Sequence, residues 1–75
     1  MISQKKQTIH ILKLLVNRVS GKKLKADDNL FQLLDSLEIM NLLSSIEKKY
    51  KKKLNMEKIL NKDRLDLKFL SKQLN

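Results

Sequence analysis

Ser36 is the residue whose type and position suggest covalent chemistry, because it follows Asp35 at the start of the most regular apolar pattern in the chain. We expect its hydroxyl at the first turn of a helix. There, backbone N–H groups without partners and the positive end of the helix dipole stabilise a phosphate ester. Ser and Asp are also among the most common helix caps, so an isolated Asp-Ser-Leu tripeptide by itself favours a purely structural cap. Both interpretations of Ser36 stay open at this point.

Other chemistry has little support in the residue types present. The chain contains no cysteine and a single histidine, His10. Disulfides, thiolate zinc sites and imidazole pairs are therefore excluded. No glycine-rich phosphate-binding loop is present either, since the chain has one glycine. Its three methionines suit packing gaps better than a cofactor role.

The composition predicts one small helical domain over residues 1–75. Seventy-five residues allow a single core, and one glycine with no proline does not supply the turns of a β-sandwich or barrel. A chain of this size has no room for a catalytic cleft between domains. We therefore expect a binding or carrier module and not an enzyme.

The first helix is predicted over Ser3–Val19, because its apolar residues recur at helical spacing. Ser20-Gly21 is expected to end it, since glycine tolerates the left-handed conformation found after helix ends. The polar residues that follow show no helical period, and we expect a long loop from Gly21 to Leu34. The apolar positions on the helix face are Ile9, Leu12, Leu15, Val16 and Val19; those that pin the loop are Leu24, Leu30, Phe31 and Leu33.

The second helix is predicted from Asp35-Ser36 to Tyr50. Asp35 and Glu38 stand three residues apart, which indicates a capping box, and lysines at the other end suit the negative end of the dipole. We expect Leu37, Met40, Leu43 and Ile46 to form one apolar stripe. Ile39, Leu42 and Tyr50 widen it.

The rest of the chain predicts two further helices. Asn55 is a candidate cap for a short helical turn with Met56, Ile59 and Leu60 facing inward. Asp66 is a candidate cap for a final helix, Leu67–Leu74. The expected fold is all-α: a small four-helix bundle with three longer helices, a short third helix and a long loop between the first two.

The pattern resembles the acyl carrier and peptidyl carrier proteins. Residues 35–50, DSLEIMNLLSSIEKKY, are similar to the family signature, an Asp-Ser-Leu at the head of the second helix with an acid, paired apolar residues and a closing aromatic. Residues 27–33, DDNLFQL, look like the apolar loop segment before that signature. Asp66-Leu67 with Leu70 and Leu74 is similar to the last helix of the family.

The resemblance implies a four-helix bundle of acyl-carrier type that carries 4′-phosphopantetheine as a phosphodiester on Ser36. The terminal thiol of that group would hold an acyl or aminoacyl cargo as a thioester, so the chain itself needs no cysteine. Asp35 would help a phosphopantetheinyl transferase to engage. Partner enzymes would dock on Leu37, Glu38, Met40, Asn41 and Glu47. The residues that could shelter a cargo in the interior are Leu33, Leu43, Ile46, Ile59 and Leu70.

Some residues depart from the family pattern. The family commonly has a glycine two or three residues before the aspartate, and LFQLLDSL (residues 30–37) has none. The Leu-Leu-Asp-Ser sequence also occurs in D-alanyl carrier proteins, which makes an amino acid a possible cargo. Asn41, Lys48 and Lys49 stand where the family commonly has acids. Like charges suppress wrong partners across an interface, so we expect a dedicated pathway and not bulk fatty-acid synthesis.

The net charge of +9 suggests a second function class. A basic helical interaction protein would bind nucleic acid or an acidic partner through its lysines, above all those between Lys48 and Lys53. Fifteen of the seventeen basic residues are lysine, however, with Arg18 and Arg64 the exceptions, and aromatics are few. Specific nucleic-acid readers depend on arginine and aromatic side chains, so we do not expect nucleic-acid binding.

The N-terminal segment is not expected to be a signal peptide, because His10 and Lys13 interrupt its apolar stretch. No run approaches the roughly 18–20 apolar residues that span a bilayer. We expect a monomeric cytoplasmic protein that does not insert into membranes.

Overall fold

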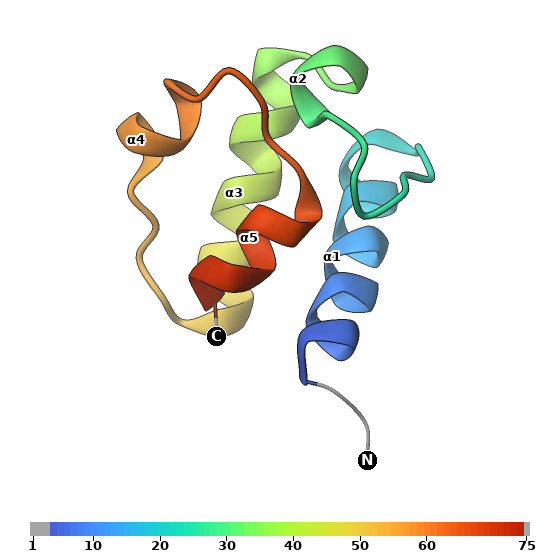
Figure 1. Ribbon diagram of the computed structural model, residues 1–75, viewed down its shortest axis with the longest axis vertical. Helices are drawn as coiled ribbons and strands as arrows, with labels where there is room; N and C mark the ends of the chain where they lie inside the picture. Colours follow the sequence, from blue (N-terminus) through green and yellow to red (C-terminus); the bar gives the residue numbers. More distant parts are fainter. Residues whose placement is uncertain (1–3, 75) are drawn as a thin grey trace.

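The computed structural model describes residues 4–74, with side chains described from residue 7 onward, and forms a small helical bundle (Figure 1). No strand occurs in this part of the chain. The prediction of an all-α bundle with three longer helices and a short one before the last is confirmed. Ser3, the predicted start of the first helix, lies outside the described residues. The helices are α1 (Gln4–Ser20), α2 (Leu30–Leu33), α3 (Ser36–Tyr50), α4 (Met56–Leu60) and α5 (Leu67–Leu74).

Polar side chains and one glycine set the helix ends, largely as the sequence predicts. Gly21 has φ +73° directly after α1, the left-handed conformation that glycine adopts without steric cost. Asn55 caps α4, its side-chain oxygen accepting from Lys58 N at 3.0 Å. Asp66 caps α5, with Oδ1 accepting from Phe69 N at 2.8 Å. These caps satisfy N–H groups that have no partner within their helices.

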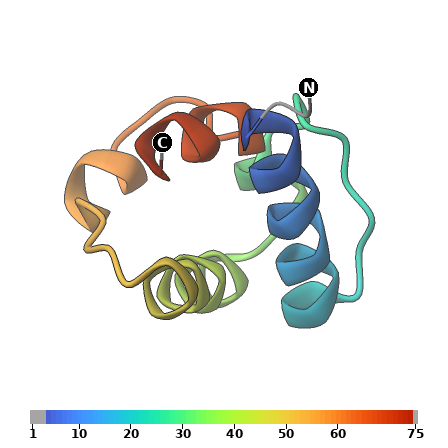
Figure 2. The same cartoon turned by 90° about the horizontal axis from the view of Figure 1, so that it is seen from below.

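The core lies between the three longer helices. Both α3 and α5 pack on α1, and Figure 2 shows the three helices around a shared interior, with α4 on the side away from α1. This interior consists of leucine, isoleucine and valine, whose removal from water is the main source of stability for the fold. The fully buried apolar side chains are Leu12, Val16, Leu30, Leu42, Leu43, Ile46, Leu65, Leu67 and Leu70.

The long loop between α1 and α3 contains a helical turn, α2, that the sequence pattern does not predict. Asn29 caps it through its side-chain oxygen, and Leu34 N bonds Leu30 O at 2.8 Å. Within this turn Leu30 and Leu34 are buried, while Leu33 is 38% exposed. The prediction that Leu33 pins the loop to the core is therefore wrong. Leu33 is the last residue of the turn, and the chain becomes extended at Leu34, which is buried in its place.

The buried face of α3 also differs from the predicted stripe. Ile39, Leu42, Leu43 and Ile46 are buried, whereas Leu37 is 69% and Met40 40% exposed. At about 100° per residue, position 37 lies roughly opposite position 39 around the helix, and the four buried residues fall within one narrow sector. The prediction that Leu37 and Met40 share one stripe with the buried Leu43 and Ile46 is therefore wrong.

A smaller correction concerns α4, where Leu60 was expected to face inward. Ile59 is buried in the core, and Met56 packs against it. Leu60 is 40% exposed. A five-residue helix makes little more than one turn, so few of its side chains can face the core. Met56 and Ile59 occupy these positions.

Backbone hydrogen bonds fix the long loop against the segment before α5 and the first turn of α5. Leu30 N donates to Leu65 O at 2.6 Å, and Lys68 N donates to Ala26 O at 3.3 Å. Asn29 Oδ1 also accepts from Leu65 N at 3.1 Å. The residues that lead into α3 are thus held by contacts with a segment more than thirty positions away in the sequence, which fixes where α3 begins. None of the described helices is long and apolar enough to cross a membrane.

Candidate functional site at the start of α3

Asp35 and Glu38 form a complete capping box at the first turn of α3. Asp35 Oδ1 accepts from Glu38 N at 2.8 Å, and Glu38 Oε1 accepts from Asp35 N at 3.0 Å. Two backbone N–H groups that a helix start leaves without partners are thereby satisfied reciprocally. The carboxylates also lie at the positive end of the helix dipole, where negative charge is favoured. This confirms the capping box that the sequence predicts.

Ser36 is the first residue of α3 and is exposed. Asp35 provides the cap, so the serine hydroxyl is not used for capping, and it makes no hydrogen bond with any residue in the described range. The N–H groups of Ser36 and Leu37 have no partner within the helix, because the first intrahelical bond runs from Ile39 N to Asp35 O at 3.0 Å. The structure thus separates the two interpretations of this tripeptide: the cap is Asp35, and Ser36 presents an unused hydroxyl.

A cation lies close to this end of the helix. The side-chain amine of Lys22 donates to the carbonyl of Leu33, three residues before Ser36. This contact joins the beginning of the long loop to the end of α2 and places a positive charge beside the segment that enters α3. Lys22 is one of three lysines among residues 22–25, and nothing in the sequence indicates which of them has this role.

Four of the predicted docking residues lie together in the first turns of α3. Leu37, Met40 and Asn41 are exposed, and Glu38 is half-buried because its carboxylate belongs to the capping box. Exposed leucine and methionine next to an unused serine hydroxyl form an apolar surface of the kind that contacts partner proteins. This surface depends on the outward placement of Leu37 and Met40 described above.

Glu47 lies apart from these residues, in the last turn of α3. Its Oε2 accepts from Leu54 N at 2.7 Å and so fastens the segment that connects α3 to α4. Glu47 is half-buried. The structure does not bring it to the surface around Ser36. This internal hydrogen bond is not predictable from the sequence pattern, because its partner is a backbone group seven residues away.

Of the five residues proposed to shelter a cargo, four are buried and one is exposed. Leu43, Ile46, Ile59 and Leu70 are each at most 3% exposed and lie in the core. Leu33 is 38% exposed, and its assignment to the interior is wrong. These four buried side chains belong to α3, α4 and α5, the helices that surround the interior beside α1.

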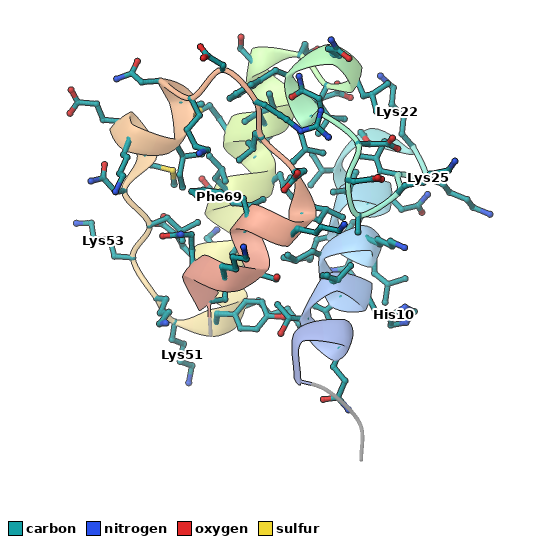
Figure 3. The ribbon with its side chains drawn as sticks, viewed as in Figure 1. His10, Lys22, Lys25, Lys51, Lys53 and Phe69 are labelled. Atoms are coloured by element: carbon teal, nitrogen blue, oxygen red, sulfur yellow. The ribbon has the colours of Figure 1, made fainter. Side chains whose placement is uncertain are left out.

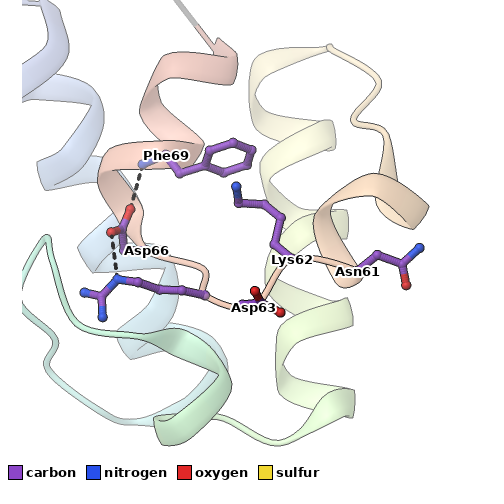
Figure 4. A pocket seen from close by; sticks show the side chains of 6 residues that line it. Asn61, Lys62, Asp63, Asp66 and Phe69 are labelled. Atoms are coloured by element: carbon purple, nitrogen blue, oxygen red, sulfur yellow. Dashed lines mark hydrogen bonds and ion pairs between the residues drawn. The ribbon is translucent and has the colours of Figure 1, made fainter.

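A hollow of about 490 Å³ lies where the chain passes from α4 to α5 (Figure 4). Lys62 Nζ lies 4.2 Å from the centroid of the Phe69 ring, a cation–π distance. Arg64 Nε lies 3.5 Å from Asp66 Oδ2, and the Arg64 guanidinium also donates to the carbonyl of Asp27. These side chains therefore already hold one another and the long loop. No group of three or more His, Cys, Asp or Glu that could bind a metal occurs among the described residues.

Together these features define a class of protein: a small helical bundle that presents a serine hydroxyl at the head of an amphipathic helix and has no metal cluster in its described part. A model of the family described as "Phosphopantetheine attachment site" matches residues 10–66. The chain belongs to this phosphopantetheine-binding family. Comparisons with curated proteins and with solved structures found no match to either.

Family membership identifies the cofactor and the general role. The group attached in this family is 4′-phosphopantetheine, bound covalently to a serine, and the protein is a carrier of acyl groups. When bound, the group supplies a terminal thiol that the chain lacks, since the sequence has no cysteine. The start of α3 fits such a group, because an exposed hydroxyl there adjoins two backbone N–H groups without helical partners.

Proposed function

We propose that the Ser36 hydroxyl is the attachment point of 4′-phosphopantetheine and that the chain carries an acyl or aminoacyl group for a dedicated pathway. The observation that carries this proposal is that the residue that caps α3 is not the serine at its start. Asp35 and Glu38 satisfy the helix end between them, and Ser36 remains exposed with an unused hydroxyl. A phosphodiester there faces the N–H groups of Ser36 and Leu37 and the positive end of the helix dipole.

The other serines in the matched segment are less suitable. Ser20 donates its hydroxyl to Val16 O at 2.8 Å. Ser44 and Ser45 lie in the middle of α3, where the backbone N–H groups are already bonded within the helix. Of the four serines between residues 10 and 66, Ser36 alone combines an exposed hydroxyl with a helix start.

The neighbouring residues have distinct proposed roles. Asp35 contributes a carboxylate for recognition by the phosphopantetheinyl transferase, in addition to its structural role as the cap. Leu37 and Met40 contact the transferase and the enzymes that load and use the cargo, because they are the exposed apolar side chains nearest in sequence to Ser36 on α3. Glu38 and Asn41 contribute polar contacts to docking beside Ser36, and Glu47 contributes one at the other end of α3. No role in catalysis is proposed for any side chain.

The charge of the chain supports a dedicated pathway. The formal net charge is +9, and Lys48 and Lys49 are exposed in the last turn of α3. A partner with a basic docking surface would be repelled, whereas one matched to this chain would not, so the charge selects among enzymes. We propose that the chain acts as a monomer and a single domain in the cytoplasm.

The experiment is loading with coenzyme A and a broad-specificity phosphopantetheinyl transferase, read by intact-protein mass spectrometry. The wild-type chain is expected to gain one 4′-phosphopantetheine group with full conversion. Ser36→Ala is expected to gain none, and Ser44→Ala, an exposed serine on the same helix, is expected to load like the wild type.

Circular dichroism of both variants confirms that each remains folded. The proposal is wrong if the wild type gains no mass, or if Ser36→Ala still gains it. The mass of the protein isolated from its own host then identifies the cargo.

A further inference from the structure

A second surface feature lies between α1 and α3, away from the Ser36 hydroxyl. It is an open hollow of about 380 Å³. Its wall toward the core is Leu15, which is buried, and Ser45 is half-buried beside it. The remaining lining is Arg18 from α1 with Lys48 and Lys49 from α3. Three cations and no carboxylate line this hollow.

The three basic side chains reach the hollow because of how the helices run. Figure 1 shows α1 and α3 in roughly opposite directions, and the two helices pack on each other. Long side chains on a helix lean toward its N-terminus. Arg18 near the end of α1 and Lys48 near the end of α3 therefore lean toward each other, which gathers positive charge from both helices.

This charge is not neutralised within the protein. The one ion pair among the described residues joins Arg64 and Asp66, and Arg18, Lys48 and Lys49 make no hydrogen bond there. Glu47, next to Lys48 in sequence, is engaged with Leu54 N. The dipoles of α1 and α3 account for a cation at the end of each helix. They do not account for three cations around one hollow without a carboxylate between them.

Other lysines of the chain differ in this respect. The amine of Lys52 donates to Gln73 O at 3.4 Å and to Leu74 O at 3.3 Å, and the amine of Lys22 donates to Leu33 O. Figure 3 shows Lys22 and Lys25 on one side of the molecule, distant from Lys51 and Lys53 on the other. The positive charge is thus spread widely over the molecule. At the hollow between α1 and α3, three cations lie together and form no hydrogen bond or ion pair with the described residues.

One exposed face of α3 connects this hollow to the surface around Ser36. Positions 37, 41, 44 and 48 recur at spacings of four, three and four, which places them on the same face of the helix. All four residues are exposed. The face begins with the apolar Leu37, continues through uncharged Asn41 and Ser44, and ends at Lys48. At 1.5 Å per residue, the apolar and basic ends lie roughly 16 Å apart.

We propose that the hollow between α1 and α3 binds an acidic segment of a protein partner that contacts Leu37 at the same time. Carboxylates of that segment pair with Arg18, Lys48 and Lys49, about 16 Å from its apolar contact. The continuous face from Leu37 to Lys48 favours a protein over nucleic acid, because phosphates offer nothing to the exposed leucine. The inference rests on the proposed function, since the partner is an enzyme that acts on the group at Ser36.

The test uses the loaded full-length protein, labelled with ¹⁵N, and a synthetic helical peptide of about 20 residues. The peptide carries two leucines on one face and three glutamates about eleven residues further along that face, to match the spacing on α3. A second peptide has glutamine at the three acidic positions. Shifts of backbone amide resonances during titration report both the affinity and the place of binding. Duplex DNA and vesicles of anionic phospholipid are titrated in parallel at the same ionic strength.

Two variants with the same net charge separate the hollow from the overall charge. Arg18→Glu with Lys48→Glu and Lys49→Glu reverses the hollow. Lys25→Glu with Lys58→Glu and Lys72→Glu reverses three exposed lysines elsewhere, two of them also in last helical turns. Three reversals of two units each lower the formal charge of both variants from +9 to +3.

We expect the glutamate peptide to bind about tenfold more tightly than the glutamine peptide, with shifts along α3 from residue 37 to residue 49 and near Arg18. The hollow variant should lose about tenfold in affinity, and the control variant less than about threefold.

The inference is wrong if the two peptides bind equally, if both variants weaken binding equally, or if DNA or vesicles bind the hollow more tightly than the peptide. Loading at Ser36 is measured first by mass. Failure of loading contradicts the proposed function, whereas normal loading without peptide binding contradicts only this inference.

Discussion

The two ends of α3 are stabilised in different ways. At the first turn, Asp35 and Glu38 bond each other's backbone N–H groups within four residues of sequence. At the other end the chain leaves the helix through Lys51, a non-glycine residue in the left-handed conformation with φ 52° and ψ 39°. That conformation costs an L-residue roughly 1–2 kcal/mol. The start of α3 is thus locally favourable, and its end is not.

Contacts with distant segments hold the unfavourable end. Glu47 accepts from Leu54 N, and Lys52 bonds the last carbonyls of α5, where a cation is favoured by the helix dipole. The difference between the two ends follows from what each must do. The first presents a serine at a fixed place and needs local order, whereas the second turns the chain toward α4 and carries exposed charge.

Among substitutions at the two ends of α3, Asp35→Ala is expected to change stability the most. Loss of the cap leaves Glu38 N without its acceptor and should lower the free energy of unfolding by about 1–2 kcal/mol. Asp35→Asn should lose much less, because asparagine caps helices about as well. Urea denaturation measures both.

Loading by a phosphopantetheinyl transferase then separates the two proposed roles of Asp35. Asp35→Asn keeps the cap and removes the charge, so slow loading with near-normal stability supports recognition of the carboxylate. Equal stability of Asp35→Ala and the wild type would show that the capping box is not a main source of order at this end.

The second prediction concerns the opposite end, where Lys51→Gly should raise the free energy of unfolding by up to about 1 kcal/mol. Glycine adopts the left-handed conformation without the steric cost that lysine has there. Lys53→Gly is the matched control, since Lys53 is exposed and has no positive φ. Lys53→Gly should not raise the free energy of unfolding, because glycine gives the unfolded chain more backbone freedom and relieves no strain at this position. A gain in both variants would assign the effect to charge and not to backbone conformation.

The sequence predicts the locally ordered end far better than the other. The capping box, the helix beginning at Ser36, and the caps Asn55 and Asp66 depend on residues a few positions apart, and all of them are confirmed. The unused Ser36 hydroxyl could not be predicted, because Asp35 and Ser36 are both good caps and only geometry shows which one serves.

The features that the sequence does not predict depend on distant partners. The turn α2 is tied to the segment before α5 through Leu65, and Glu47 is tied to Leu54. Seven apolar residues on α3 form two overlapping stripes, so the pattern does not separate the exposed Leu37 and Met40 from the buried residues. The position of α1 and α5 decides which stripe is buried, and the amphipathic pattern of α3 alone does not contain that information.

A third prediction uses Tyr50, the last residue of α3, whose ring packs against the core. Its hydroxyl is buried without a hydrogen bond of good geometry. Burial raises the pKa of Tyr50 above its usual value of 10.0, and the interaction with Thr8 lowers it by less. Because the folded state favours the neutral form, this contribution to stability is complete below pH 10 and is lost as the pH rises through the higher folded-state pKa.

Tyr50→Phe should therefore reduce the fall in stability above pH 10 and change stability at pH 7 by less than about 1 kcal/mol. Lysine deprotonation affects both proteins alike, so the difference between their melting curves isolates the tyrosine. An unchanged pH dependence would mean that the hydroxyl is solvated in the folded state.

The smallest effect expected is a rise of about 2–4 °C in melting temperature on addition of roughly 10 mM sulfate, corresponding to about half a kcal/mol in a chain of this size. Five lysines lie between residues 48 and 53, and no carboxylate pairs with them in the described structure. A divalent anion reduces their mutual repulsion in the folded state, where they are held closer together than in the unfolded chain. Sulfate at this concentration is too dilute for general exclusion effects to contribute much.

Two variants locate the repulsion. Lys49→Gln with Lys53→Gln removes two charges from the lysines of residues 48–53, and Lys58→Gln with Lys72→Gln removes two from other helices. If repulsion is concentrated among the lysines of residues 48–53, the first variant has the higher melting temperature without sulfate. Its melting temperature then rises less than that of the second variant when sulfate is added. Equal behaviour would mean that the net charge of the whole chain matters and that the end of α3 is not special. Differential scanning calorimetry decides between these outcomes, because the start of α3 is unchanged in both variants.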